Sequence, residues 1–546
     1  MKAPASTHRV LQVLSFLLAC LMLAGSFVAC ANPDTSDKDA LGTSEVANGS
    51  KDADDTSGET PSETAGDISG ETSDETSDET SDETSDKTSD KTSDETSGDI
   101  SGETSDETSD EISNEPEPEY VPTIEKKNYN TDFNITNVYF NKEWLVIDEE
   151  NVQSGNVLNE TVFERCARIE DHLGVNCVLA DAGSWIEYAN KVTRTVQTGE
   201  DAYQLVTTHV HQGVTTLATG ENILLDFADI PVINLDASYW NKKVMDQLKI
   251  NDRYMMGYND FLLADTHCVT FNKDLLNTYA MESPYELVRN KTWTLDKLFE
   301  MASIAAKDNG DGVWDENDQY GLTGWGWIFL ISFLTSSDLT IMDIDPETGK
   351  YSVSYPREGI KLQELIDKIY AMYTADYSYM WPSTFTTTVD ISTGRALFQL
   401  YPTTSLHSLA ATDIRFGILP YPLYDTAQEE YKSMNWNGLM CVPASVKDKQ
   451  MVGEVLELLA YYTGPVKTAY YETQLGTTIV NAPEDAEMLD LIWKSQTNDI
   501  GLACADHIND LVYMVPMLCE RGTTNYASFY KAHKKSAEKS LKKIFG

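Results

Sequence analysis

Apolar positions follow two periods along the chain from about residue 130 onward. Short apolar, β-branched runs alternate with longer stretches in which apolar positions recur every three to four residues. The first pattern predicts strands and the second amphipathic helices. Strands are expected at 134–140, 175–180 and 203–208, and helices at 161–173 and 186–197. This strand–helix–strand–helix–strand order predicts an α/β fold with a largely parallel sheet.

A polar loop follows the third predicted strand. In parallel sheets ligands bind beyond the carboxyl ends of the strands, and His209, His211 and Gln212 stand there. Two histidines one residue apart could also hold a metal, but the sequence offers no obvious third ligand. Hydrogen bonding to a bound molecule, or plain surface exposure, is the favoured interpretation.

The first thirty residues have the layout of an export signal. Lys2 and Arg9 are basic, 10–24 is mostly apolar, and small residues lead to Cys30. A cysteine at this position resembles the lipid-acceptor cysteine of bacterial lipoprotein signals. Cys20 is the alternative acceptor, although it lies inside the apolar run, and an uncleaved anchor or an ordinary signal peptide remain open.

An acidic Thr-Ser-Asp-Glu repeat separates this leader from the rest of the chain. Residues 31–120 contain 30 acidic and 4 basic side chains, so this segment has a net charge of −26 out of −48 for the whole chain. With almost no large apolar side chains, it cannot offset the entropy lost on ordering. We expect a disordered tether over 31–120 whose ends lie roughly 50 Å apart.

The remainder, residues 121–546, is long for one domain and natural for two lobes. No basic stripe suited to phosphates was identified, so nucleic acid is not an expected partner. Six cysteines lie in this part, with no metal-type spacing, and most are expected to be buried small residues with their pairing left open: Cys166, Cys177, Cys268, Cys441, Cys504 and Cys519.

Six short motifs resemble family 1 extracellular solute-binding proteins, the maltose-binding-protein-like group that serves ABC sugar importers. They occur in the order of that family across most of 207–465. They are 267–276 (HCVTFNKDLL), 291–294 (KTWT) with a helix to Ala305, 319–322 (QYGL), 394–398 (GRALF), 416–422 (FGILPYP), and 437–445 followed by a helix at 452–462.

The resemblance implies an α/β, two-lobed periplasmic-binding-protein-like fold of type II, with hinge crossovers and a ligand cleft. By this mapping, lobe 1 comprises about 123–262 and 440–490, and lobe 2 comprises about 266–435 and 491–546. Closure on ligand would be a hinge motion.

Sugars are held by aromatic rings under their C–H faces and by polar groups around their hydroxyls. Trp325 and Trp327 alternate with glycines that could leave their rings open, in a segment where the family contributes aromatic contacts. Trp436 and Asn437 stand at a predicted crossover. The other expected contacts are Tyr401, Thr403, Trp185 and Asp260. Alternating tryptophans on a strand also fit one ring in the core, and 401–403 also fits a plain turn.

The stretch 308–318 (DNGDGVWDEND) resembles a calcium-binding loop. With Gly312 as the turn glycine, the candidate ligands are Asp308, Asn309, Asp311, Asp315 and Asp318. Lys307 falls on the first ligand position, where it cannot coordinate. A structural calcium ion is therefore one interpretation and an acidic turn is the default; no other cofactor is expected.

The leading functional hypothesis is a non-enzymatic, surface-anchored binding protein on the outer face of a bacterial cell membrane. It would deliver a carbohydrate to the permease subunits of an ABC transporter and attach to the membrane through lipid on Cys30. A secreted polysaccharide hydrolase is the alternative of another class, although no nucleophile or metalloprotease motif is present. A sensor or adhesin on the same fold is a third.

Overall fold

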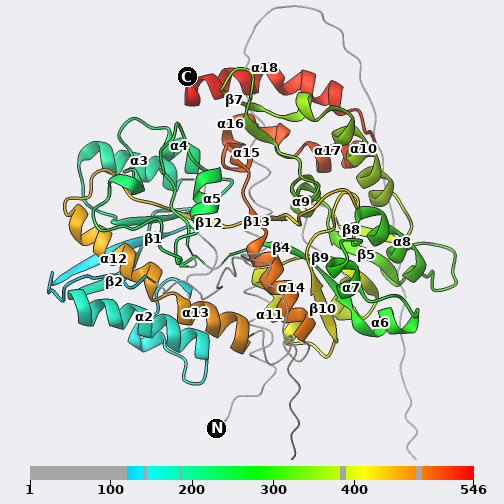
Figure 1. Cartoon of the computed structure of the whole chain (residues 1–546), viewed down its shortest axis with the longest axis horizontal. Coiled ribbons are helices and arrows are strands. Elements are labelled where there is room, and N and C mark those ends of the chain that lie inside the picture. The colour runs from blue at the N-terminus through cyan, green and yellow to red at the C-terminus, as the bar shows by residue number, and fades with distance from the viewer. Residues whose placement is uncertain are drawn as a thin grey trace, which may run out of the picture. The chain divides into compact units, whose positions relative to one another are not determined.

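The computed structural model describes residues 120–138, 144–184, 187–259, 261–262, 264–381, 389–474 and 483–546. Cys30 and nearly all of the predicted tether lie outside these residues. The described chain forms two sheet-centred lobes, with most C-terminal helices along one end (Figure 1). Within this part of the chain, no helix is both long and apolar enough to cross a membrane.

Lobe 1 is built on a four-stranded sheet in the order β12-β3-β1-β2. β1 runs parallel to β2 and β3, whereas β12 is antiparallel to β3. The strands are β1 (Thr131–Asn137), β2 (Val175–Ala180), β3 (Leu205–His209) and β12 (Gly438–Cys441). The helices are α2 (Val157–Leu173), α3 (Tyr188–Thr198), α4 (Val214–Ala218), α5 (Lys242–Gln247), α12 (Lys449–Tyr461) and α13 (Gly464–Thr468), with short turns η2 (Glu149–Asn151), η3 (Phe227–Asp229) and η6 (Ala469–Gln474).

The ends of α2 show how local sequence sets an element. The side chain of Asn156 accepts a hydrogen bond from the backbone N–H of Asn159, so the helix begins at Val157, earlier than apolar periodicity alone predicts. Gly174 ends it in the left-handed region, with φ of 61°. β2 then starts at Val175, where the sequence predicts it.

Lobe 2 is built on a five-stranded mixed sheet in the order β10-β4-β9-β5-β8. β4 is antiparallel to both of its neighbours, and β5 is parallel to both of its neighbours. The strands are β4 (His267–Asn272), β5 (Tyr320–Trp325), β8 (Ser378–Trp381), β9 (Ala396–Pro402) and β10 (Phe416–Leu419). The helices are α6 (Lys273–Thr278), α7 (Pro284–Arg289), α8 (Leu295–Ala305), α9 (Ile328–Ser336), α10 (Tyr355–Tyr373), α11 (Leu406–Ala410) and α14 (Pro483–Lys494), with turns η4 (Ile391–Thr393) and η5 (Thr403–Ser405).

Two features fix the core of lobe 2. Every residue of α9 is buried, which agrees with its almost continuous apolar sequence. α8 lies so close to β5 that a Cβ on Gly321 would collide with the carbonyl oxygen of Ala302. The glycine in the 319–322 motif is therefore required by close packing of backbone on backbone.

Three chain segments, which we call crossings, lie side by side between the lobes. Thr266, which precedes β4, pairs with Asn435, and β11 (Ser433–Met434) runs parallel to β13 (Gln496–Thr497). The chain passes from β11 directly into β12 of lobe 1, and β13 leads to the C-terminal elements. The predicted two-lobed α/β fold is confirmed.

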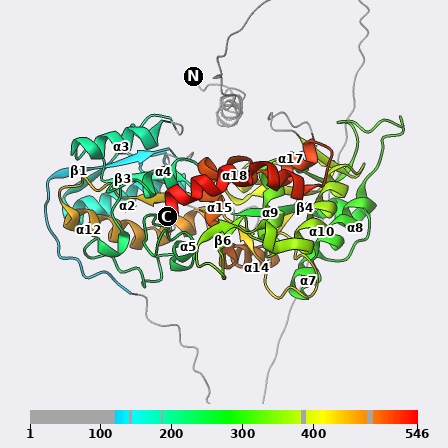
Figure 2. The ribbon, with the colours of Figure 1, turned by 90° about the horizontal axis from the view of Figure 1, so that it is seen from above.

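The C-terminal helices pack on α9, α10 and a small hairpin that connects to lobe 2. The hairpin is β6 (Met342–Ile344) and β7 (Tyr351–Val353). The helices are α15 (Ile500–Ala503), α16 (Ala505–Ile508), α17 (Met514–Glu520) and α18 (Tyr526–Phe545), with the turn η7 (Asn509–Leu511). Figure 2 shows α18 crossing the face of the molecule seen from above.

Candidate functional site

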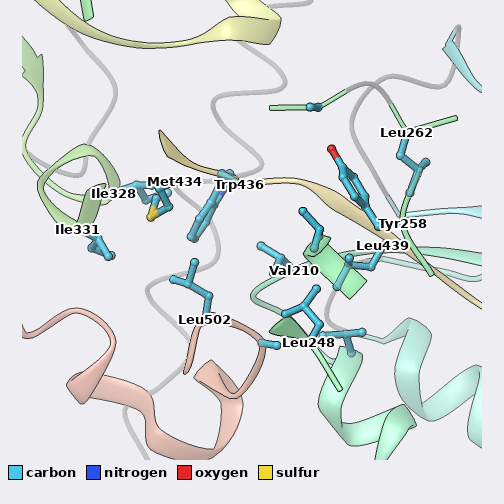
Figure 3. Packing of buried hydrophobic residues seen from close by; sticks show 14 of the residues in the cluster. Val210, Leu248, Tyr258, Leu262, Ile328, Ile331, Met434, Trp436, Leu439 and Leu502 are labelled. Atoms are coloured by element: carbon cyan, nitrogen blue, oxygen red, sulfur yellow. The ribbon is translucent and has the colours of Figure 1, made fainter. Parts of the chain in front are cut away.

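Trp436 lies on the crossing from β11 to β12, where both lobes and the C-terminal helices meet. Its backbone N–H donates to the carbonyl of Asp265, 2.8 Å away, on the crossing that precedes β4. The side chain is only 5% exposed. Figure 3 shows the indole beside Met434 and Ile328, with Leu502 and Val210 close by. The indole therefore lies where these parts of the chain converge.

The two loop histidines predicted from the sequence contact this indole. The ring centroid of His211 is 4.4 Å from that of Trp436, and the centroid of His209 is 5.0 Å away. The Nδ1 atoms of the two imidazoles are 2.9 Å apart, so one donates a hydrogen bond to the other. β12 places them, because Gly438 pairs with His209 and Val210 donates to the carbonyl of Asn437. The backbone N–H of Gln212 closes the same loop by donating to the carbonyl of His209.

Lobe 2 contributes a third histidine that sequence reasoning missed. His267 begins β4, and its ring centroid lies 6.3 Å from that of Trp436. Its Nδ1 is 2.7 Å from Oγ of Ser332 on α9, and its ring packs edge-on against Phe329 at 4.8 Å. His267 is the first residue of the 267–276 motif and the first strand residue after a crossing. That position is the signal that could have identified it.

All three imidazoles are held neutral by burial. Desolvation lowers the pKa of His209 to about 3 and that of His267 to about 3, with a smaller contribution in His267 from the repulsion it would feel from a protonated His209. Burial, followed by the charge on His209, also lowers the pKa of His211 well below its usual value. A neutral imidazole carries one donor and one acceptor nitrogen. The junction therefore offers hydrogen-bonding groups of both kinds without a net charge.

A chain of buried amides links the crossings beside Trp436. Nδ2 of Asn498 donates to Oδ1 of Asn437 at 2.9 Å, and Nδ2 of Asn435 donates to Oδ1 of Asn498 at 3.3 Å. Asn437 is fully buried, and its own Nδ2 donates to the carbonyl of Gly438. Asn437 thus holds the crossing in place. Asn498 follows β13 in a polar stretch with no motif, so the sequence contained no signal for it.

The two tryptophans of the 323–327 segment are less open than the sequence suggested. Trp325 is 5% exposed and Trp327 is 9% exposed. The ring of Trp325 lies 6.3 Å from that of Phe329, and Trp327 stacks on Tyr513 at 5.2 Å. The flanking glycines could have left the rings open, and one ring in the core was the alternative. The apolar helix α9 and the C-terminal segment cover them instead.

Thr403 and Tyr401 belong to the end of β9. The hydroxyl of Thr403 is buried; it donates to the carbonyl of Ala264 and accepts from the backbone N–H of Thr266. Tyr401 is half-buried and pairs with Cys268 across the sheet. Thr403 therefore braces the first crossing. Trp185 and Asp260 lie outside the described residues.

The calcium-like loop is closed by its own backbone. Oδ1 of Asp318 accepts from the backbone N–H of Asn309 at 2.8 Å, and its Oδ2 accepts from that of Asp315 at 2.7 Å. Carboxylate or amide oxygens of Asp308, Asn309, Asp311 and Asp315 likewise accept from backbone N–H groups two or four residues ahead. Across the described residues, no three His, Cys, Asp or Glu side chains are grouped so as to hold a metal ion. The side-chain oxygens of this loop therefore hold its own backbone.

The six cysteines of the folded part are all buried and unpaired in this structure.

Comparison with known proteins places this fold. No protein-family model and no curated protein sequence matches the chain. A cyclo/maltodextrin-binding protein complexed with maltotetraose matches in structure with a TM-score of 0.50 at 14% identity, covering 75% of this chain and 96% of that one. A substrate-binding protein from Listeria monocytogenes in complex with cycloalternan gives a TM-score of 0.49 at 12% identity, covering 77% and 99%. The maltose/maltodextrin-binding domain from Bdellovibrio bacteriovorus bound to maltotriose gives 0.48 at 14%, covering 75% and 100%.

At these identities the likeness concerns the fold. It agrees with the resemblance drawn from the six sequence motifs. The described part of this chain has the two-lobed fold of the maltodextrin-type ABC substrate-binding proteins.

Proposed function

We propose that this protein is a solute-binding protein that captures a carbohydrate between its two lobes and does not chemically alter it. The observation that carries the proposal is the position of Trp436, on a crossing and in contact with imidazoles from both lobes. An indole face suits the C–H face of a sugar, and neutral imidazoles suit its hydroxyls. The cyclo/maltodextrin-binding protein of the same fold was solved with maltotetraose, which supports a sugar ligand.

Ligand access requires the lobes to separate. In the structure, these rings pack on one another, and lobe 1 is hydrogen-bonded to the C-terminal helices. The hydroxyl of Thr215 donates to the carbonyl of Ala503 at 2.8 Å, and the N–H of Gly213 donates to the carboxylate of Asp506 at 2.5 Å. A hinge opening at the three crossings would expose Trp436 and the histidines together. The ligand would then replace the ring–ring contacts.

The binding proposal is tested by calorimetry on the chain that begins at Ala31, against malto-oligosaccharides and monosaccharides. We expect binding of at least one sugar, with affinity lost in Trp436→Ala and kept in Trp314→Ala. Trp314 is the matched control because it lies in the acidic loop, with its ring 5.5 Å from that of Tyr320. No heat with any sugar, or equal losses in both variants, would refute the assignment. Release of reducing ends from an oligosaccharide would refute the absence of turnover.

The finer part of the proposal is that the protein is anchored outside the cell membrane through lipid on Cys30 and delivers its ligand to an ABC permease. The leader and the acidic tether support anchoring. Labelling with a radioactive fatty acid in a bacterial host tests it. We expect Cys30→Ser to abolish the label and Cys20→Ser to retain it. The reverse result would move the lipid to Cys20, and no label in the unmodified chain would refute lipid attachment.

A further inference from the structure

The last helix of the chain is strongly basic, in contrast to the rest of the protein. α18 contains six lysines and one glutamate, whereas the whole chain has a net charge of −48. All six lysines are exposed. Only Lys534 forms an ion pair among the described residues, with Glu538 at 3.5 Å. The remaining five ammonium groups have no carboxylate partner in the described part of the chain.

These lysines form a stripe, so the expectation from the sequence that the chain has no basic stripe is wrong. Lys531, Lys535, Lys539 and Lys542 recur at helical spacing, so at about 100° per residue they fall within roughly a quarter of the helix circumference and extend over about 16 Å. Lys543 flanks the stripe. We name these five residues the lysine stripe.

The opposite face of α18 is already used. Phe529, Ala537 and Leu541 are buried, and the helix packs on α10, α16, α17 and β7. The apolar face is therefore unavailable for insertion into a bilayer, and only the ammonium groups can meet a partner. In Figure 2 no other labelled element covers the helix in the view from above.

We propose that the lysine stripe docks the folded domain on an anionic phospholipid surface. Clustered lysines beside a membrane are attracted to anionic headgroups, and the contact needs no pocket. A straight, convex row of charges on a rigid helix fits a planar charged surface better than a flexible polymer, which is usually held in a groove. Charges elsewhere on the protein are screened beyond about 8 Å at physiological salt, so the acidic remainder does not cancel the local attraction. This inference is independent of which solute the lobes bind.

Vesicle sedimentation with the chain that begins at Ala31 tests the proposal, because this chain keeps every described residue and lacks the lipid acceptor. We expect binding to vesicles of phosphatidylglycerol mixed with phosphatidylcholine, none to phosphatidylcholine alone, and release at high salt. Lys535→Gln/Lys539→Gln/Lys542→Gln should lower the partition coefficient about tenfold or more. The corresponding arginine variant should retain it.

The matched control removes the same charge elsewhere. Lys243, Lys447 and Lys449 are exposed on lobe 1, and their triple glutamine variant should change partitioning less than about twofold. Equal losses in the two triple variants, or no binding to anionic vesicles, would overturn the proposal. Binding of soluble polyglycerol phosphate without binding to vesicles would also overturn it, by identifying a polymer as the partner. Unchanged melting temperatures establish that each variant is folded.

Discussion

The junction around Trp436 and the acidic loop at 308–318 both drew attention in the sequence, but their polar groups are satisfied in opposite ways. In the loop, the carboxylates of the four aspartates accept from backbone N–H groups no more than nine residues away. At the junction, the contacts join segments far apart in the chain, such as His211 with Trp436 and Asn437 with Asn498.

The difference separates a turn from a candidate site. In this loop the side-chain oxygens accept hydrogen bonds from the backbone of the loop itself, so the turn forms without a ligand. The junction, in contrast, brings its polar groups together from segments far apart in the chain. We therefore expect substitutions at the junction to alter both stability and ligand binding, and substitutions in the loop to alter stability alone.

The largest effect is expected for Trp436→Ala. Removal of a buried indole from the junction should destabilise the protein by about 3–5 kcal/mol, measured by urea unfolding. Trp314→Ala, in the partly exposed loop, should cost less than half as much. A loss for Trp436→Ala no larger than that for Trp314→Ala would show that the junction is not a packed unit.

Loss of a buried hydrogen-bond acceptor should lower the stability of the protein in either region. Asp318→Ala leaves two backbone N–H groups unpaired and should cost about 1–3 kcal/mol with sugar affinity unchanged. Asn498→Ala should cost a similar amount and also weaken sugar binding, because it releases Asn435 and Asn437. If Asp318→Ala weakened binding as much as Asn498→Ala does, the contrast between the two regions would fail.

The buried histidines predict a pH dependence. The pKa of His267 is about 3 in the folded protein and near 6.5 when unfolded, so below pH 6.5 the unfolded state binds more protons. Stability from this residue is therefore present above pH 6.5 and lost as the pH falls toward 3. Between pH 7 and pH 5 the loss should be about 2 kcal/mol smaller in His267→Asn than in the unmodified protein.

The matched control for this measurement is His407→Asn, because His407 is exposed on α11. Unfolding at the two pH values should show the same pH-dependent loss in this variant as in the unmodified protein. Buried carboxyls oppose the histidine effect, since burial raises the pKa of Asp265 to about 7 and that of Asp499 to about 6. Their contribution cancels when variant and unmodified protein are compared. Identical losses in all three proteins would mean that His267 is protonated in the folded state.

The smallest effect is expected for calcium. Because the side-chain oxygens of the loop already accept backbone hydrogen bonds, millimolar Ca²⁺ should leave the melting temperature unchanged, as should chelation by EDTA. A melting temperature that rises with Ca²⁺ in the unmodified protein but not in Asp318→Ala would identify the loop as a metal site. The loop would then depend on a ligand, as the junction is proposed to do.

The sequence predicted the fold well where a motif contains a residue that the packing requires, or where an apolar run coincides with a strand. Gly321 is needed because α8 touches β5, and β2 begins where the apolar run begins. The environment of single side chains was harder to predict. Trp325 packs against α9, whose continuous apolar sequence was the available signal for burial, whereas Trp327 stacks on Tyr513 of the C-terminal segment. His267 and Asn498 reach Trp436 only through the pairing of Thr266 with Asn435 and of β11 with β13, which no local pattern encodes.

The interleaved course of the chain constrains the order in which the protein can be completed as the chain emerges from its N-terminus onward. β3 is an inner strand of the finished sheet, yet its partner β12 follows all five strands of lobe 2 in the sequence. Until residue 438 has emerged, β3 presents an unpaired edge able to join a neighbouring molecule. α14, which packs on β10 of lobe 2, emerges later still. A chaperone or slow emergence at this stage would protect the first lobe from misassembly before its last strand arrives.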